Sequence, residues 1–298
     1  MNFQKRKSSS FSELHYFKTI SREIADHFLS DGATDWDGYR ISECAKIIRS
    51  YNSSSGGVFL DPLYCKHPHC PQCQKNNAKK YRSQIHHLLD EYPELLLGNW
   101  MFLTLTVRNC DVDDLGSTID SMTDALDRLK RRKFWKKYVL GGIRFLEVTE
   151  RQRDRETVHP HFHILLLVRP SMFAGNNYVS TNLWAKHWQK ALSAHYEPMV
   201  HVKRFKGDPS EMRSRIVSHA GYSLKPRTKV LDRRRFLVLT DQMRNRNRVR
   251  SFGVVRKLLS ELRGQTAFDA IEQQEEARRR HEPKILTWDE KIAGYKPL

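Results

Sequence analysis

The chain contains no long run of hydrophobic residues. Its longest apolar run, Ile164 to Val168, is far shorter than the ~20 residues that span a bilayer. The first residues are basic and then rich in serine, so the sequence predicts no secretory signal. A Gly-Lys dipeptide is also missing, which excludes a Walker-type phosphate loop and predicts that the protein neither hydrolyses ATP nor unwinds DNA itself. These absences favour a cytoplasmic protein with no membrane partner.

Acidic residues are too few to balance the basic ones. The chain has 52 lysines and arginines against 34 aspartates and glutamates, a formal net charge of +18. Such an imbalance predicts a polyanionic partner, and without a membrane segment nucleic acid is the favoured class. The stretch from residue 225 to residue 257 is especially basic. There we expect DNA contacts from Arg233, Arg234, Arg235, Arg244, Arg246 and Arg248.

Cysteine is scarce, but three of the five cysteines cluster at Cys65, Cys70 and Cys73. An odd total with one tight cluster favours metal binding in a reducing compartment over a disulfide framework. Structural zinc prefers four ligands in a tetrahedron, and His69 is our prediction for the fourth. The alternatives for that position are His67, Cys44 and Cys110.

Hydrophobic periodicity predicts an α+β fold. Apolar residues alternate with threonine in the strand expected at 101–107, and further strands are expected at 143–149, 159–168 and 199–205. Apolar residues at helical spacing mark 119–129, and further helices are expected at 75–94, 183–194 and 211–224. We expect an antiparallel sheet of about five strands backed by helices. The expected domains are a partly helical extension at 1–60, a cysteine-rich zinc segment and helix at 61–100, a main domain at 101–260 and a charged tail at 261–298.

Two histidines open the most apolar strand. Because strand side chains alternate, His161 and His163 should leave the same face of a sheet and form a clamp for a divalent metal. A third ligand is needed, and Glu147 in the neighbouring strand is preferred over Glu150, which begins a loop. Such a set suits Mn²⁺, Mg²⁺ or Zn²⁺ with positions open for a phosphate oxygen. His159 shares the same face but is expected at the rim.

A tyrosine follows on a later predicted helix. Tyr222 and Lys225 are three residues apart, which on a helix places them on one face. A phenol has an ordinary pKa near ~10, so as a nucleophile it needs help from a nearby cation. Lys225 would orient the phosphate or assist the phenol.

These segments occur in a familiar order. The motif 102–106 (Phe-Leu-Thr-Leu-Thr), then Glu147, then the His-Pro-His-Phe-His run at 159–163, then Tyr222-x-x-Lys225 resemble the His-hydrophobic-His (HUH) endonucleases, and more narrowly the plasmid rolling-circle replication initiators. The cysteine segment before the first motif is also similar to that family. The resemblance implies an HUH endonuclease domain at 101–260 that uses Mn²⁺ or Mg²⁺, with zinc as a structural ion.

The resemblance also implies a mechanism. Tyr222 would nick one strand of plasmid origin DNA, single-stranded or hairpin, leave a 5′-phosphotyrosine link and later rejoin the strand. A host helicase and DNA polymerase are implied partners, and whether the protein acts as a homodimer stays open. Some relatives carry a tyrosine or an acidic residue one turn before the nucleophile, where this chain has Ser218, so its termination chemistry is unassigned.

Two other functions remain as alternatives. A transposase or relaxase would use the same chemistry on other DNA, and a non-catalytic zinc-dependent DNA-binding protein would share only the charge and the cysteines.

Tryptophans are expected either in the core or stacked on unpaired bases. They are Trp135, Trp184 and Trp188.

Overall fold

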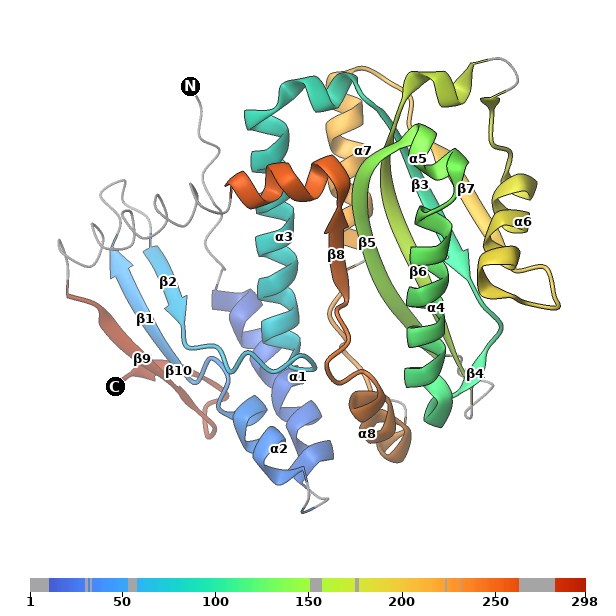
Figure 1. The fold of residues 1–298 in the computed structure, drawn as a ribbon. Coiled ribbons are helices and arrows are strands. Elements are labelled where there is room, and N and C mark those ends of the chain that lie inside the picture. The colour runs from blue at the N-terminus through green and yellow to red at the C-terminus, as the bar shows by residue number, and fades with distance from the viewer. Residues whose placement is uncertain are drawn as a thin grey trace. The chain divides into compact units, whose positions relative to one another are not determined.

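The fold consists of two compact units, each described here by itself (Figure 1). A computed structural model describes residues 11–29, 32, 34–52, 58–150, 157–174, 177–222, 224–230, 232–262 and 282–298. Unit 1 combines residues 1–79, 225–233 and 263–298, and unit 2 combines residues 80–224 and 234–262. Both chain ends therefore belong to unit 1.

Unit 1 contains helices and a small antiparallel sheet. Helices α1 (Phe11–Leu29) and α2 (Asp35–Ser42) precede strands β1 (Ile47–Asn52) and β2 (Val58–Pro62), and α3 (Pro71–Glu91) starts here. The sheet order is β10-β9-β1-β2, so β9 (Lys284–Asp289) and β10 (Gly294–Pro297) come from the far end of the chain. Residues 41–48 contain the end of α2 and the beginning of β1.

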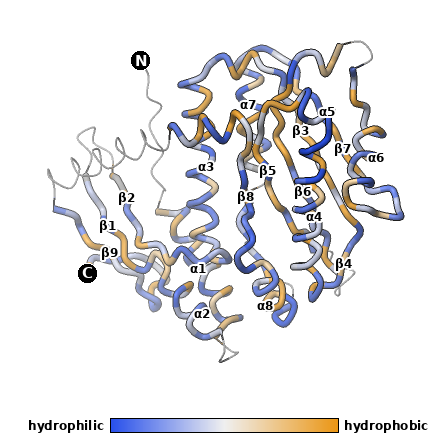
Figure 2. Tube along the Cα trace, in the orientation of Figure 1, coloured by the Kyte–Doolittle hydropathy of each residue, from blue (hydrophilic) through white to orange (hydrophobic). Residues whose placement is uncertain are grey.

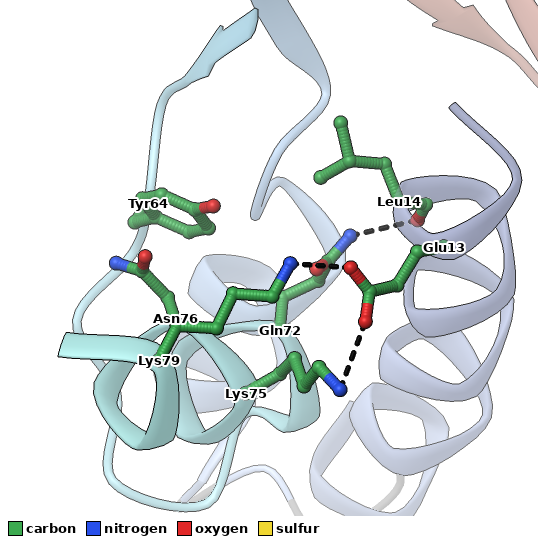
Figure 3. Close-up of a pocket in the computed structure, with 7 residues that line it drawn as sticks. All are labelled: Glu13, Leu14, Tyr64, Gln72, Lys75, Asn76 and Lys79. Atoms are coloured by element: carbon green, nitrogen blue, oxygen red, sulfur yellow. Dashed lines mark hydrogen bonds and ion pairs between the residues drawn. The ribbon is translucent and has the colours of Figure 1, made fainter. Parts of the chain in front are cut away.

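A half-buried carboxylate joins two helices of unit 1. Glu13 of α1 pairs with Lys75 at 2.8 Å and with Lys79, both on α3 (Figure 3). Beside them the Gln72 side chain donates a 2.8 Å hydrogen bond to the carbonyl of Leu14. These contacts fix α1 against the first turns of α3, where Cys73 lies.

Unit 2 is built on a sheet with the order β7-β3-β6-β5-β8. Its strands are β3 (Asn99–Thr106), β5 (Val139–Glu150), β6 (Thr157–Val168), β7 (Val200–Arg204) and β8 (Val249–Phe252), with the short β4 (Cys110–Asp111) also pairing with β6. Neighbouring strands pair antiparallel throughout. The predicted α+β class with a sheet of about five strands is confirmed.

Helices cover both faces of this sheet. One face packs against α4 (Leu115–Lys130), α5 (Lys133–Tyr138) and α6 (Thr181–Leu192), and the other against α3, α7 (Pro209–Tyr222) and a helix at 253–262. The short 3₁₀ segments are Pro93–Leu97, Val112–Asp114 and Pro170–Phe173, and α8 (Arg233–Gln242) precedes β8. Because both faces are covered, the inner strands are largely hydrophobic (Figure 2).

The expected period of the helix at 119–129 is confirmed. Ile119, Met122, Leu126 and Leu129 are all buried in the core beneath α4. Core positions also hold Trp135, Trp184 and Trp188, so the alternative in which these rings stack on bases is wrong.

Two consecutive glycines, Gly141 and Gly142, lie inside β5. A Cβ atom at Gly142 would lie 2.2 Å from the carbonyl oxygen of Leu165, and one at Gly141 would lie 2.8 Å from that of Phe252. Backbone therefore approaches both positions too closely for any side chain. The pairing register shifts beside Gly141, which marks a β-bulge.

Candidate functional site

Glu147, His161 and His163 come together on one face of the unit 2 sheet. Glu147 on β5 lies directly opposite His161 on β6, and His163 lies opposite Phe145. The Oε2 atom of Glu147 is 2.9 Å from Nε2 of His163 and 3.5 Å from Nε2 of His161, and the two Nε2 atoms are 3.1 Å apart. The convergence predicted from strand alternation is therefore present in the structure. We call these three residues the Glu-His-His group.

The outer nitrogens of both imidazoles are already engaged. Nδ1 of His161 lies 3.2 Å from the carbonyl oxygen of His159, and Nδ1 of His163 lies 3.1 Å from Oγ1 of Thr104. A carbonyl only accepts, so Nδ1 of His161 must carry the proton. Because Nδ1 is held by this carbonyl, Nε2, the nitrogen that faces Glu147, is the ring atom that would bind a cation, as in a metal-binding histidine. The donor set thus fits a divalent cation.

The pKa of Glu147 agrees with a role as a metal ligand. Burial acts to raise the pKa of Glu147, but hydrogen bonds and positive charge from His161 and His163 outweigh it and hold that pKa well below its usual range. The carboxylate is therefore ionised at neutral pH and available as a ligand.

Glu150, the alternative ligand, has a different partner. It is buried beside Arg235, with Nε of the arginine 3.7 Å from its carboxylate, and Arg235 also donates to the carbonyl of Thr157. Only 5% of the Arg235 side chain and 8% of the Glu150 side chain are exposed. The DNA contact expected from Arg235 is wrong here, because its guanidinium is buried in an ion pair inside unit 2.

The other expected DNA-binding arginines differ in their surroundings. Arg246 forms a two-pronged pair with Asp120, at 2.6 and 3.0 Å, and Arg244 pairs with Asp241 at 3.2 Å. Arg233 donates to the carbonyl of His27. Arg234 is exposed and Arg248 is half-buried, so the DNA-binding role of the set stays a prediction.

Helix α7 packs on the sheet face that carries the Glu-His-His group. Its residue His219 contacts Phe102 at a ring distance of 4.8 Å, and Phe102 stacks on His163 at 5.1 Å. Tyr222 is the last residue of α7, three positions after His219, and its side chain lies outside the described residues. The last turn of α7 therefore lies next to the candidate metal ligands.

Two features of this turn were not expected from the sequence. A Cβ atom at Gly221 would lie 2.3 Å from Nε of Arg82 on α3, so the small residue before Tyr222 leaves room for a guanidinium. Lys225 lies beyond the end of α7, so the prediction that it shares a helical face with Tyr222 is wrong. The roles of Tyr222 and Lys225 themselves stay predictions.

Four cysteines of unit 1 form a second candidate metal site. Cys65, Cys70 and Cys73 are joined by Cys44, and their sulfurs lie within 4.8 Å of one another. Sγ of Cys73 is 3.7 Å from that of Cys44 and 3.6 Å from that of Cys65. Zn–S bonds of about 2.3 Å in a tetrahedron separate the sulfurs by about 3.8 Å, so the spacing fits zinc.

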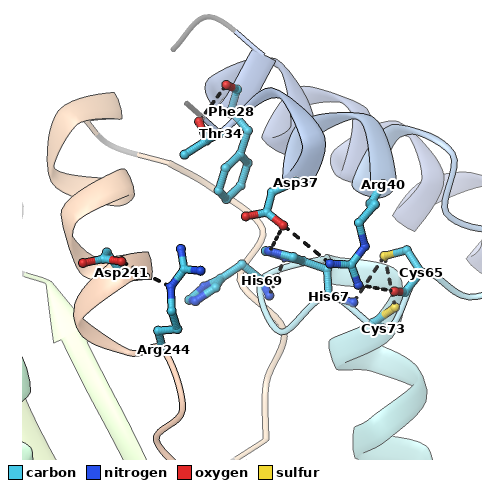
Figure 4. A network of polar contacts seen from close by, with 10 residues as sticks. All are labelled: Phe28, Thr34, Asp37, Arg40, Cys65, His67, His69, Cys73, Asp241 and Arg244. Carbon is cyan, nitrogen blue, oxygen red and sulfur yellow. Dashed lines mark hydrogen bonds and ion pairs between the residues drawn. The ribbon is translucent and has the colours of Figure 1, made fainter. Parts of the chain in front are cut away.

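Cys44 corrects our choice of His69 as the fourth ligand. The backbone amide of His69 donates to the ring of His67, which in turn lies 3.4 Å from Asp37 (Figure 4). Arg40 contacts the same carboxylate and donates to the carbonyl of Cys65. The histidines therefore brace the cysteine loop instead of completing the sulfur cluster.

The backbone around the four sulfurs is arranged for thiolates. Amide groups of Lys66 and His67 donate to Cys73 at 3.2 Å and to Cys65 at 3.4 Å. Lys66 has a φ of 60°, a turn that a non-glycine residue rarely adopts. Buried Lys18 donates to the carbonyl of Cys44 at 2.9 Å and places a cation beside the cluster. These donors offset the negative charge that bound thiolates bring.

Thr104 is a site residue that the sequence did not reveal, although it lies in the first quoted motif. Replacing it with valine keeps the shape and removes the hydrogen bond to His163. We expect Thr104→Val to weaken binding of Mn²⁺ by about tenfold to a hundredfold, because the ring loses its fixed orientation. Isothermal titration with Mn²⁺ measures this. Thr106→Val, which removes a bond to the carbonyl of Met199, is the matched control and should bind Mn²⁺ normally.

Among the described residues, no helix combines the length and the hydrophobicity needed to cross a bilayer.

The structure thus defines an α+β protein with a Glu-His-His group on its main sheet and a four-cysteine cluster in a separate unit. Residues 58–296 match the family described as Replication protein, and the chain belongs to that family. It is 36% identical over 213 residues to a Protein rep of Streptococcus pneumoniae, covering 70% of this chain and 66% of that protein. A Protein rep of Lentilactobacillus hilgardii is 29% identical, covering 69% of this chain and 65% of the relative.

The chain therefore spans slightly less than two thirds of the length of these relatives. A Protein rep of Bacillus amyloliquefaciens is 30% identical over 206 residues, which is 58% of its length. No solved structure matches the chain.

Proposed function

We propose that the chain starts plasmid replication by nicking one strand of the plasmid origin, with Tyr222 as the nucleophile. The phenol oxygen attacks the phosphorus and gives up its proton to solvent. A bond forms between tyrosine and the 5′ phosphate, and the bond to the 3′ oxygen breaks. That oxygen takes up a proton and leaves as a free 3′-hydroxyl, which primes synthesis. Attack by a 3′-hydroxyl on the phosphotyrosine reverses these steps and rejoins the strand.

The observation that carries this proposal is the shared sheet face. Glu147, His161 and His163 converge on it, and the last turn of α7, which ends at Tyr222, packs beside them through His219. The three ligands would hold Mn²⁺ or Mg²⁺, which when bound stabilises the negative charge that develops on the phosphate. Membership of the replication-protein family favours this function over that of a transposase or relaxase.

Further parts of the proposal concern partners and zinc. The four cysteines hold a structural zinc ion, and Arg234 and Arg248 contribute to binding of origin DNA. A host helicase and polymerase extend the new 3′ end. The reduced cysteines agree with a cytoplasmic location.

The test is covalent capture of DNA. The protein is incubated with a single-stranded origin oligonucleotide and Mn²⁺, and a complex that survives denaturant is resolved on a gel. Wild type should form the complex, and Tyr222→Phe should form none while binding the oligonucleotide with unchanged affinity. Tyr178→Phe, which alters an exposed phenol elsewhere in unit 2, is the matched control and should react normally.

Two results would contradict the proposal. A complex that persists in Tyr222→Phe would assign the nucleophile to another residue. Wild-type protein that binds the oligonucleotide yet forms no complex with Mn²⁺ or Mg²⁺ would favour a non-catalytic DNA-binding protein instead.

A further inference from the structure

Strand β7 forms an edge of the described unit 2 sheet, beside the strands that carry the Glu-His-His group. It pairs with β3, with His201 opposite Thr104 and Lys203 opposite Phe102. Residues directly opposite in a sheet share a face. Thr104 in turn lies opposite His163 on β6. His201 and Lys203 therefore leave the sheet on the same face as the Glu-His-His group.

Both side chains are exposed on that face, and neither forms an ion pair with a residue that the structure describes. Two strand spacings separate His201 from His163, a distance across the sheet of roughly 10 Å. Lys203 lies one row further along the strand, level with the Phe102 ring that contacts both His163 and His219.

The charge of Lys203 reaches the turn that leads to Tyr222. Burial lowers the pKa of His219, its bond to the carbonyl of Arg215 opposes this, and the positive charge of Lys203 lowers that pKa further. Lys203, His219 and the candidate metal ligands thus lie within electrostatic range of one another. Phe102 lies directly opposite Lys203, and Leu165 lies opposite Phe102 on the next strand. Neither of these side chains is a carboxylate that could neutralise the charge of Lys203.

The opposite face of the same strand has a different character. Arg204 lies next to Lys203 in sequence but points to the other side, where its guanidinium lies 3.8 Å from the centre of the Phe173 ring and donates to Asn99 at 3.0 Å. Strand β7 thus has one basic residue that is held by protein contacts and one that leaves the sheet on the face of the Glu-His-His group.

We propose that His201 and Lys203 bind the phosphodiester backbone of single-stranded DNA next to the phosphate that is cut. This inference rests on the proposed nicking function and names the surface that orients its substrate. Lys203 supplies a positive charge for one phosphate, and His201 supplies a hydrogen bond to a neighbouring phosphate or sugar. The edge of a sheet leaves this path open to an extended strand.

The experiment measures DNA binding in the absence of divalent metal, so that it does not depend on cleavage. Fluorescence anisotropy with a labelled single-stranded oligonucleotide in EDTA gives the dissociation constant from 0.05 to 0.3 M salt, for wild type, Lys203→Ala and Arg204→Ala. The logarithm of the affinity falls linearly with the logarithm of the salt concentration, and loss of one phosphate contact should make this slope less steep by about 0.7. Affinity should then fall about fourfold at 0.15 M salt and about eightfold at 0.05 M.

The variants at positions 203 and 204 should therefore differ in their affinity for DNA, although the two wild-type residues are neighbours of equal charge. Lys203→Ala should show the loss, and Arg204→Ala should bind like wild type, with circular dichroism confirming that both are folded. His201→Ala should lose roughly two- to tenfold at every salt concentration with an unchanged slope, as expected for a neutral hydrogen bond. Equal slopes for Lys203→Ala and wild type, or no binding of single-stranded DNA by wild type, would overturn the inference.

Covalent capture separates this outcome from failure of the proposed function. If wild type forms the covalent complex while Lys203→Ala binds DNA normally, the β7 surface is wrong and the nicking proposal stands. If Lys203→Ala binds more weakly but wild type never forms the complex, the surface binds DNA and the nicking proposal is wrong.

Discussion

Two neighbouring glutamates on β5 should respond in opposite ways to the same substitution. Glu147→Gln should abolish metal binding and slow nicking by about 10²–10³-fold, because an anionic ligand of the Glu-His-His group becomes a weak neutral one. Its unfolding free energy, measured in chelator, should change little, since Glu147 is only partly buried. Mn²⁺ titration and the rate of covalent capture measure the first two effects.

Glu150→Gln should show the reverse pattern. It removes the carboxylate charge that lies 3.7 Å from the buried guanidinium of Arg235, and breaking such a buried pair costs about 3–5 kcal/mol. Urea unfolding should therefore shift to lower concentration, while the folded protein still binds Mn²⁺. If Glu150→Gln abolished metal binding and Glu147→Gln did not, the ligand would be the residue at the start of the loop, the alternative raised from the sequence.

The Glu-His-His group was predictable because its geometry depends on local rules. Alternation along β6 fixes His161 and His163 on one face, and a short connection between two strands predicts the antiparallel pairing that brings Glu147 opposite. The sequence does not specify the register with β3. Thr104 and the β7 residues His201 and Lys203 were therefore not found, although each lies in a strand that was expected.

The parts that escaped prediction depend on contacts between distant segments. Strand β9 pairs with β1 across more than two hundred residues and β10 pairs with β9, and the charged composition of 261–298 gave no sign of either strand. Cys44 lies 21 residues before Cys65, outside the short spacing that marks a zinc cluster, whereas His69 lies within it. Sequence distance thus favoured His69, whereas the fold brings the sulfur of Cys44 to those of the other three cysteines.

The four-cysteine cluster leads to a prediction that separates these two residues. Cys44→Ala should remove zinc from the purified protein, reducing the content from one ion per chain to none, because three thiolates remain. The apparent binding free energy of structural zinc in small domains is about 10–16 kcal/mol, so unit 1 should lose its fold with the metal. Zinc released by thiol modification and far-UV circular dichroism measure the two effects.

Two controls make the result specific. Cys110→Ala removes a half-buried thiol of unit 2 and should keep both zinc and fold. His69→Ala should keep zinc too, since the His69 amide, which the substitution retains, supplies its contact with His67. Zinc lost in His69→Ala but retained in Cys44→Ala would restore the ligand inferred from spacing.

Because α1 packs on the cysteine loop through Lys18, which donates to the carbonyl of Cys44, loss of the metal should also expose α1 to proteolysis.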